Sequence, residues 1–436
     1  MPATPEVPTP AMPATPEGRT PGSDRLAQLP VHTADVAGFI GEALAAGSGL
    51  LHLAPCWVPR SFLRPGRRLR LHPDDLYPFG VARGGIDERW LSSTVTADND
   101  GRQPDEGLSY VIAAGQRVTL QEAIAAGGAD LLGAGLWQAY GRWPVFAKLF
   151  DNAGPIPHHM HQSDAQVAAL GRVGKPEAYY FPPQYNAQPN DFPYTFFGLN
   201  PSTRPSDVRD CLARWHEGDN GILGLSPAYR LEVGTGWLVD PRILHAPGSL
   251  CTFEPQWASD VFAMFQSVLD GQPIPWSLLV KDMPPEHHDD LDFIVAALDW
   301  EKNVDPTFVA RHFLRPRIAS ASPDHVDRWV VYGRIDGQQC FTARELTIAP
   351  GGQATVVEPG CHGLLCTQGA GRVNGQPLAA PTMIRFGQLT RDEYFVGAPA
   401  ATAGVHYENH SDVEPLVVLR YYGPEADPGA PEAGEA

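Results

Sequence analysis

The sequence predicts a mainly β protein of two domains, on the basis of its length, its turn residues and the runs between them. A chain of 436 residues is too long for one compact core, so two domains are expected. Its 44 Gly and 44 Pro are spread along the chain and separate short runs of Val, Ile, Leu and aromatic residues. This alternation is typical of short strands joined by turns. The expected class is therefore mainly β, with short helical insertions and a helical linker.

The strand-like runs fall into two groups, which set the expected domain boundaries. A first domain with an N-terminal extension and a helical insert is expected over 26–269, followed by a partly helical linker over 270–325. A second domain is expected over 326–423, where β-type runs alternate with regular turns as in a barrel or sandwich. The Pro-, Ala- and Thr-rich arm 1–25 and the acidic, Pro- and Gly-rich tail 424–436 are predicted to be disordered.

Three helices are predicted within this β pattern. Thr119 and Glu122 form a capping-box pattern for a short helix over 119–126, which two glycines then end. Apolar residues at helical spacing predict a second helix over 200–215 and a third over 287–298. The second helix interrupts the strand series of the first domain, and the third lies in the linker.

Composition narrows the class of partner. The formal charge of −18 argues against nucleic acid and anionic membranes, since both would repel the average surface. No apolar run reaches the roughly 18 residues that a membrane-spanning helix needs. The six cysteines form no C-x-x-C pair and no dense framework, which fits a reducing cytoplasm. We therefore expect a cytoplasmic protein that binds a small molecule; its oligomeric state does not follow from the sequence.

A set of three histidines and one carboxylate predicts a metal site. Residues two apart share one face of a strand, so His159 and His161 point the same way and can share an ion. Glu177 lies in a later strand-like segment with Lys175 on the same face, and His245 follows a turn. Three imidazoles and one carboxylate suit a divalent ion. The predicted ligands are His159, His161, Glu177 and His245.

Each of these residues also has an ordinary structural explanation. A histidine on an apolar strand is usually only hydrogen-bonded, Glu177 can be a surface acid, and Lys175 can form an ion pair. The ordered set of ligands favours the metal site over these alternatives. Lys175 and Glu254 are the candidate catalytic bases, because both lie near ligand positions and on strands. Glu254 can equally orient a histidine.

Several motifs around these residues resemble those of the type I mannose-6-phosphate isomerase family, which are zinc-dependent proteins with two cupin (jelly-roll) barrels. The likeness runs over most of residues 50–420. Glu88-Arg89-Trp90-Leu91-Ser92-Ser93 is similar to the family's Glu-x-Trp-x-x-Ser stretch, and Phe146-Ala147-Lys148-Leu149-Phe150-Asp151 is similar to an apolar strand that ends near Asp. Gly174-Lys175-Pro176-Glu177 is similar to its Gly-Lys-x-Glu motif.

The resemblance extends to the remaining ligands and carries expectations about activity. The family's Gln-x-His pair falls on His159-Met160-His161, and its last ligand falls on His245 before Ala246. By this resemblance Glu177 is a zinc ligand and Lys175 lies near the substrate. It also implies two cupin barrels, the second of them degenerate, and a metal-dependent aldose–ketose isomerase that acts on a sugar or a sugar phosphate.

Two positions depart from the family pattern. His159 stands where the family has Gln, which leaves Mn, Fe, Ni or Co open beside zinc. Met264 stands where the family has an Arg after a Ser-Asp pair, and no Arg occurs between 243 and 310. An altered substrate is therefore expected, with its phosphorylation left open.

Two further functions suit the same ligands. Three His and one Glu on a cupin barrel are also compatible with an oxygenase that uses Fe or Mn. A non-catalytic sugar-binding protein would fit a chain in which the missing Arg marks lost chemistry. The second domain has only the scattered His362, His406 and His410, with no H-x-H pair, and is expected to be structural.

Overall fold

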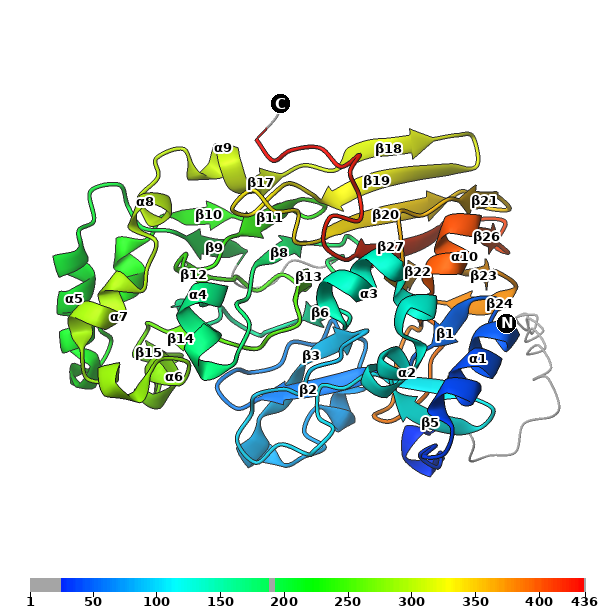
Figure 1. The fold of residues 1–436 in the computed structure, drawn as a ribbon. Helices are drawn as coiled ribbons and strands as arrows, with labels where there is room; N and C mark the ends of the chain where they lie inside the picture. Colours follow the sequence, from blue (N-terminus) through cyan, green and yellow to red (C-terminus); the bar gives the residue numbers. More distant parts are fainter. Residues whose placement is uncertain (1–24, 188–192, 435–436) are drawn as a thin grey trace, which may run out of the picture.

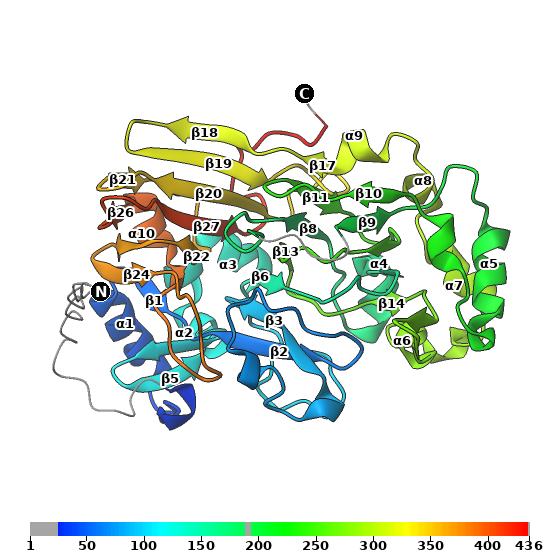
Figure 2. The same ribbon diagram turned by 180° about the vertical axis from the view of Figure 1, so that it is seen from behind.

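The computed structural model describes residues 25–187 and 193–434 and is mainly β, as the sequence predicts (Figure 1). Within these residues two seven-stranded sheets are joined by smaller sheets of five, four and two strands. Helices α5–α8 gather at one end of the molecule and α1, α2 and α10 at the other, with the sheets between them (Figures 1 and 2). The predicted arm 1–25 lies, apart from Arg25, outside the described residues.

The first half of the fold pairs a seven-stranded sheet with a five-stranded sheet. In spatial order the seven strands are β17 (Phe313–Leu314), β11 (Gly236–Val239), β8 (Glu177–Tyr180), β13 (Thr252–Trp257), β6 (Val145–Phe150), β3 (Gly85–Leu91) and β2 (Cys56–Arg60). The five are β10 (Ala228–Arg230), β9 (Tyr194–Phe197), β12 (His245–Ala246), β7 (His159–Met160) and β14 (Ala263–Met264). An apolar cluster joins the two sheets through Tyr179 and Trp237 of the larger sheet and Phe197 of the smaller one.

The second half repeats this two-layer arrangement. Its seven-stranded sheet has the order β1 (Leu50–His52), β25 (Glu393–Val396), β22 (His362–Gln368), β27 (Leu416–Tyr422), β20 (Thr342–Ile348), β19 (His325–Val331) and β18 (Arg317–Ala321). The facing sheet is β21 (Gln353–Val356), β26 (Val405–Asn409), β23 (Ala370–Val373) and β24 (Gln376–Ala379). Leu346 and Leu364 of the larger sheet pack in one core with Val373 and Tyr407 of the smaller sheet.

Short hairpins and helices complete the fold. The hairpins are β4 (Tyr110–Ala113) with β5 (Gln116–Thr119), and β15 (Val268–Leu269) with β16 (Gln272–Pro273). The helices are α1 (Val36–Ala46), α2 (Leu120–Leu132), α3 (Ala134–Tyr140), α4 (Asp164–Val167), α5 (Pro205–Ala213), α6 (Ser277–Val280), α7 (Leu291–Ala296), α8 (Trp300–Asn303), α9 (Phe308–His312) and α10 (Ala398–Ala403). In the described chain, no helix combines the length and the apolar character that crossing a membrane requires.

The predicted helices are present with shifted ends. At the start of α2, the Glu122 backbone N–H donates to Thr119 Oγ1 at 3.2 Å, and the Thr119 N–H donates to the Glu122 carboxylate at 3.0 Å. The two glycines interrupt this helix and do not end it as predicted, because Gly128 takes φ 46° and ψ −126° before the helix resumes. The linker helix is α7, which begins after Asp290, whose side chain accepts from the Phe293 N–H.

The observed sheets cross the predicted domain boundaries. Strand β1 lies within the predicted first domain, yet it pairs with β25 in the second half, Leu51 opposite Phe395. Strand β18 begins at Arg317, before the expected start at 326, and pairs with β19. Both differences have one cause, since an edge strand can be supplied from any point along the chain that reaches the sheet.

Residues 424–434, part of the tail predicted to be disordered, contact the second half of the molecule. Asp427 is buried, and its carboxylate accepts hydrogen bonds from Trp329 Nε1 and from the Arg344 guanidinium at 2.6–2.8 Å. The Gln339 side chain donates to the Asp427 carbonyl at 2.8 Å. One buried acid with these partners holds this segment against β19 and β20, although its composition is that of a disordered tail.

A buried ion pair connects the two halves. The Arg89 guanidinium, on β3, donates to Asp392 at 2.7 and 3.0 Å and to Glu393 at 3.0 Å, and all three side chains are at most 1 % exposed. Arg89 comes from the first half, whereas Glu393 begins β25 of the second. Removal of the guanidinium would leave two buried carboxylates without their cation.

We predict that Arg89→Ala lowers the free energy of unfolding by about 3–5 kcal/mol, the usual cost of breaking a buried pair from one side. Arg334→Ala is the control, because Arg334 pairs with Glu425 and Glu432 at the surface and its loss should cost less than about 1 kcal/mol. Chemical denaturation of both variants measures the difference. Equal losses would show that the buried pair does not hold the halves together.

Candidate metal centre

The predicted ligands lie between the two sheets of the first half. His159 on β7 and His245 on β12 are direct partners across adjacent antiparallel strands of the five-stranded sheet. His161 follows β7 by one residue. Glu177 begins β8 in the seven-stranded sheet. The histidines therefore reach the site from one layer and the carboxylate from the other.

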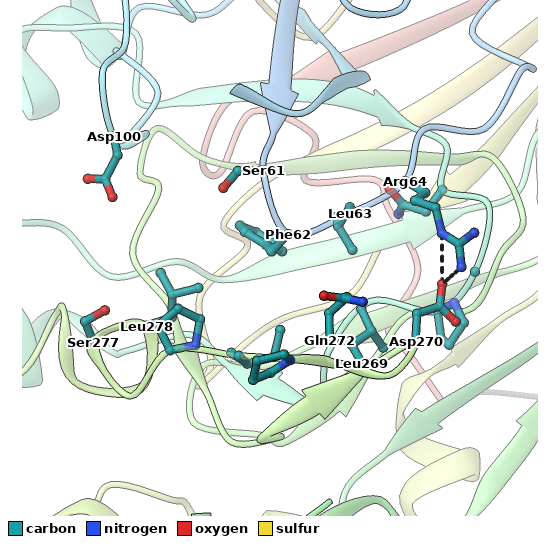
Figure 3. Close-up of a pocket in the computed structure, with 16 residues that line it drawn as sticks. Ser61, Phe62, Leu63, Arg64, Asp100, Leu269, Asp270, Gln272, Ser277 and Leu278 are labelled. Atoms are coloured by element: carbon teal, nitrogen blue, oxygen red, sulfur yellow. Dashed lines mark hydrogen bonds and ion pairs between the residues drawn. The ribbon is translucent and has the colours of Figure 1, made fainter. Parts of the chain in front are cut away.

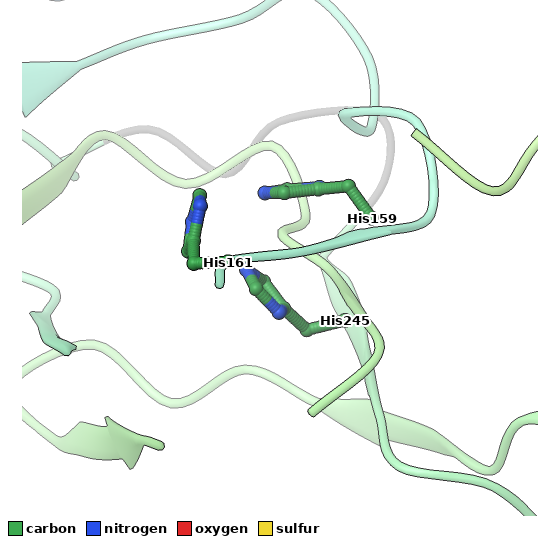
Figure 4. A group of neighbouring side chains, drawn as sticks. All are labelled: His159, His161 and His245. Atoms are coloured by element: carbon green, nitrogen blue, oxygen red, sulfur yellow. The ribbon is translucent and has the colours of Figure 1, made fainter. Parts of the chain in front are cut away.

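The three histidines form a close, buried group. Their candidate ligand atoms all lie within 4.8 Å of one another, and the imidazoles face each other (Figure 4). Ring centroids are 4.1 Å apart for His159 and His245, and 5.0–5.1 Å apart for the pairs that include His161. None of the three residues is more than 5 % exposed. The structure thus brings together the histidines that the sequence singled out.

Hydrogen bonds fix the orientation of each imidazole. Every Nδ1 lies 2.7–2.8 Å from a backbone carbonyl oxygen: His159 from Pro157, His161 from Val261 and His245 from Ile243. A carbonyl oxygen only accepts, so each Nδ1 carries the proton and donates. Each Nε2 consequently carries a lone pair and no proton, which is the form of histidine that binds metal ions. Burial supports this form, because it lowers the pKa of His161 to about 3 and that of His159 well below the usual range.

Glu177 faces two of these lone pairs. Its carboxylate oxygens lie 3.0 Å from His161 Nε2 and 3.1 Å from His245 Nε2. Burial opposes ionisation of Glu177, whereas the Lys175 ammonium favours it, and the pKa of Glu177 lies well below the usual range. An ionised carboxylate and an imidazole lone pair are both acceptors. Lys175 Nζ approaches Glu177 Oε2 and His161 Nε2, whereas His245 Nε2 has no hydrogen-bond donor. A cation between them would satisfy these buried atoms, so the donor set fits a divalent ion.

The neighbours His158 and Met160 point away from the site. His158 Nε2 lies 2.8 Å from Ser226 Oγ. Met160 belongs to the apolar cluster that contains Leu212 of α5 and Ile294 of α7. The helical insert therefore covers the outer face of the five-stranded sheet, and the strand alternation directs His159 and His161 to the inner face.

Lys175 lies against the predicted ligands. Its Nζ is 2.7 Å from Glu177 Oε2, 3.0 Å from His161 Nε2 and 3.2 Å from Glu254 Oε1. The preceding Gly174 has no room for a side chain, because a Cβ there would lie 2.4 Å from the Asp164 backbone nitrogen. This close approach gives a physical reason for glycine in the Gly-Lys-Pro-Glu segment. Both predicted bases, Lys175 and Glu254, are therefore at the site.

A chain of buried charges extends from Glu254. On β13 it is the direct cross-strand partner of Lys148 on β6, and Lys148 Nζ lies 3.2 Å from Glu254 and 3.4 Å from Glu88. Burial, together with Glu177, raises the pKa of Glu254 to about 8, against the lowering effect of Lys148 and Lys175. Burial opposes the charge on Lys148, but Glu254 and Glu88 outweigh it and raise its pKa.

The structure adds residues that sequence reasoning missed. Arg60, at the end of β2, donates to Glu88 and in a bidentate pair to Asp260 at 2.9 and 3.1 Å. The Tyr179 hydroxyl donates to Glu177 Oε1 at 2.5 Å. The sequence could have indicated Lys148 as a site residue, because it is the one charged residue in an apolar strand. It gave no such indication for Arg60, because the place of Arg60 depends on a strand far away in sequence.

Two cavities adjoin at this site. The inner one has a volume of about 40 Å³ and is lined by the site residues Arg60, Lys148, His159, His161 and Lys175, and by Met264, which pairs with His159 across β7 and β14. The outer one has a volume of about 690 Å³. Phe62 and Leu63 line both and project into the outer cavity (Figure 3). The inner cavity has room for an ion and a few waters, and a larger ligand must displace Phe62 and Leu63.

The second half lacks a comparable group among the described residues, in which the three histidines form the one candidate metal cluster. Its His362 bonds to the Gly360 carbonyl through Nδ1. His406 and His410 are each within 3.3 Å of Glu408, in half-buried and exposed positions.

Comparison with known protein families and with curated proteins finds no match. Solved structures do match, and mannose-6-phosphate isomerases are among them. A protein described as a mannosephosphate isomerase from Archaeoglobus fulgidus is 16 % identical with a TM-score of 0.57, over 86 % of this chain and 97 % of that one. Mannose 6-phosphate isomerase from Bacillus subtilis is 15 % identical with a TM-score of 0.56, over 86 % and 99 %.

A third structure, mannose 6-phosphate isomerase bound with zinc and yttrium, is 15 % identical with a TM-score of 0.54, over 86 % of this chain and 99 % of that one. The chain therefore has a mannose-6-phosphate isomerase-like fold, as the sequence motifs indicated. At this level of identity the likeness establishes the fold, whereas activity, metal and substrate have to be argued from the site.

We predict that His159→Ala, His161→Ala and His245→Ala each lower the affinity for a divalent ion by more than tenfold, since loss of even an outer partner of a metal ligand costs 10–100-fold. His158→Asn is the matched control, because this buried neighbour bonds to Ser226 instead. Elemental analysis and metal titration of the purified variants measure the effect. A normal metal content in all three alanine variants would contradict the site.

We also predict that removing the ion with a chelator lowers the unfolding temperature and that restoring it reverses the loss. An ion that binds only the folded chain stabilises it by about 2.7 kcal/mol at a concentration 100 times its dissociation constant. Thermal unfolding with and without chelator measures the shift. The His245→Ala variant should show no shift, and an equal shift in that variant would place the ion elsewhere.

Proposed function

We propose that this chain is a metal-dependent aldose–ketose isomerase that acts on a sugar, with a divalent ion held by His159, His161, Glu177 and His245. One observation carries the proposal: three buried imidazoles and the buried carboxylate of Glu177 meet in one place, where His245 Nε2 has no hydrogen-bond donor. The mannose-6-phosphate isomerase-like fold supports the reaction class. Zinc is the proposed metal, on the motif likeness and the zinc-bound neighbour, with Mn, Fe, Ni and Co as alternatives.

The reaction moves a proton between adjacent carbons while the neighbouring oxygens are held. When bound, a divalent ion polarises such oxygens as a Lewis acid. The chain must supply a group that takes the proton and a group that binds the oxygen. Glu254 is our candidate for the first role, because its Oε1 is held 3.2 Å from Lys148 and from Lys175 and has no hydrogen-bond donor with good geometry.

Lys175 is our candidate for the second role. Its ammonium lies beside two predicted ligands and Glu254, so a sugar oxygen that approaches the ion also approaches this donor. Tyr179 holds one oxygen of Glu177 and Lys175 the other, which fixes the carboxylate between them. The proton acceptor Glu254, the hydrogen-bond donor Lys175 and the ion would then act on neighbouring atoms of one substrate.

The cellular location remains part of this proposal. All six cysteines are free and buried, which supports a reducing compartment such as the cytoplasm. The proposed partner is a small sugar. We likewise propose the predicted division into two cupin domains, a metal-binding one and a degenerate one, with the boundaries moved as the strand pairing requires.

We predict that the metal-loaded protein forms a ketose from at least one aldose, and that Glu254→Gln and Lys175→Met lower kcat by roughly 10²- to 10⁴-fold, the usual contribution of a positioned acid or base. Both variants should retain the ion by elemental analysis. Glu345→Gln is the control, since Glu345 is a buried carboxyl that bonds to Tyr180 outside the site.

A panel of aldoses, each tested with several divalent metals, decides the proposal. If no ketose forms with any of them, the chain is not an isomerase. Oxygen consumption with Fe(II) and not with zinc would then favour the oxygenase. Ligand-dependent stabilisation without turnover would favour a sugar-binding protein.

A further inference from the structure

We propose that the substrate of this site is an uncharged sugar and not a sugar phosphate. The inference rests on the proposed isomerase function and narrows its substrate class. It departs from the substrate in the names of the structural neighbours, which is mannose 6-phosphate. The cations that line the two cavities already have acidic partners.

Arg60 reaches the inner cavity, but each nitrogen of its guanidinium already has an acceptor. Its Nε donates to Glu88 at 3.2 Å, one terminal nitrogen donates to Asn99 at 3.0 Å and to Asp260 at 3.1 Å, and the other lies 2.9 Å from Asp260 and 3.1 Å from Glu88. An arginine binds a phosphate through two parallel N–H groups. Here Asp260 already occupies that pair, so Arg60 cannot replace the arginine that Met264 displaces.

The ammonium groups of the two lysines in the inner cavity already have partners as well. Lys148 lies between Glu88 and Glu254 at 3.4 and 3.2 Å. Lys175 has three neighbours within 3.2 Å: Glu177, His161 and Glu254. A phosphate that took Lys175 would leave the buried Glu177 without its ammonium, and one that took Lys148 would leave Glu88 and Glu254 with one cation each.

The charge of the site allows one further negative charge. Three cations, Arg60, Lys148 and Lys175, contact four carboxylates, those of Glu88, Glu177, Glu254 and Asp260. In the state in which Glu254 is ionised and can act as a base, their formal net charge is −1. A divalent ion makes this +1. That balance suits the single charge that develops on a neutral sugar when a proton leaves carbon. A phosphate would add about −1.5 to −2 at neutral pH.

The described residues that line the outer cavity supply no unpaired cation for a phosphate. Arg64 is the one cation among the described residues that line it, and Arg64 pairs with Asp270 (Figure 3). Asp100 adds a further negative charge. The internal segment 188–192, which is not described, contains no Lys or Arg. Serine and glutamine side chains alternate there with Phe62, Leu63 and Leu278, a lining that suits the hydroxyls and C–H faces of an uncharged sugar.

The test offers each aldose of the panel free and as its phosphate ester, mannose with mannose 6-phosphate among them, to the metal-loaded protein. We expect kcat/KM for the free sugar to exceed that for the ester by at least tenfold, and inorganic phosphate to leave turnover of the free sugar unchanged. Preference for an ester, or competition by inorganic phosphate, would overturn this inference while leaving the isomerase intact.

Absence of turnover with every compound would end the isomerase proposal instead. Ligand-induced thermal stabilisation then still decides the substrate class: a shift with a free sugar and none with its ester supports the inference. A shift with the ester, or with neither compound, rejects it.

A charge variant gives an independent readout. Asp270→Asn releases Arg64 in the outer cavity and should raise kcat/KM for the ester relative to the free sugar by roughly two- to fivefold, the size expected for one exposed ion pair. Asp292→Asn is the matched control, since it releases Arg209 from a similarly exposed pair that lines neither cavity. An equal change in both variants, or no change in Asp270→Asn, would count against a phosphate-poor cavity.

Discussion

The first half of the molecule depends on one constraint, which is that buried acceptors from two different sheets are held against each other. Glu177 on the seven-stranded sheet meets the lone pairs of His161 and His245 from the five-stranded sheet at 3.0–3.1 Å. The Lys175 ammonium lies beside Glu177 and His161, but His245 Nε2 still faces the carboxylate without a donor, and packing must hold that contact. A divalent ion would turn it into an attraction between the two layers. Metal binding and the closure of this half are therefore coupled in one place.

The remaining charges follow from that centre. An ionised Glu177 stabilises the ammonium of Lys175, which also pairs with the carboxylate of Glu254. The series of alternating charges continues from Glu254 to Lys148 and Glu88. Each member is buried and stays charged only because its neighbours have the opposite sign. Such a series fixes side-chain positions closely, which a reaction with proton transfer requires. It also leaves few uncommitted cations for a charged substrate.

Local patterns made much of the fold and the metal site predictable. The period of two places His159 and His161 on one face, and the Thr119–Glu122 pair starts α2 where the capping box indicates. Contacts between distant segments could not be read from such patterns. Arg60 reaches the cavity from a strand paired through β3, and Asp427 anchors a segment whose composition alone suggests disorder.

The pairing of β1 with β25 has a consequence for how this chain is made. A ribosome completes Leu50 and Leu51 long before it reaches the strand that will cover them, so these apolar residues stay unpaired for most of synthesis. The early helix α1 and the hairpin β4–β5 are the nearby segments that can shelter them in the interval. The last strands to emerge then complete both the second sheet and the start of the chain, which makes the molecule hard to divide into separately folding pieces.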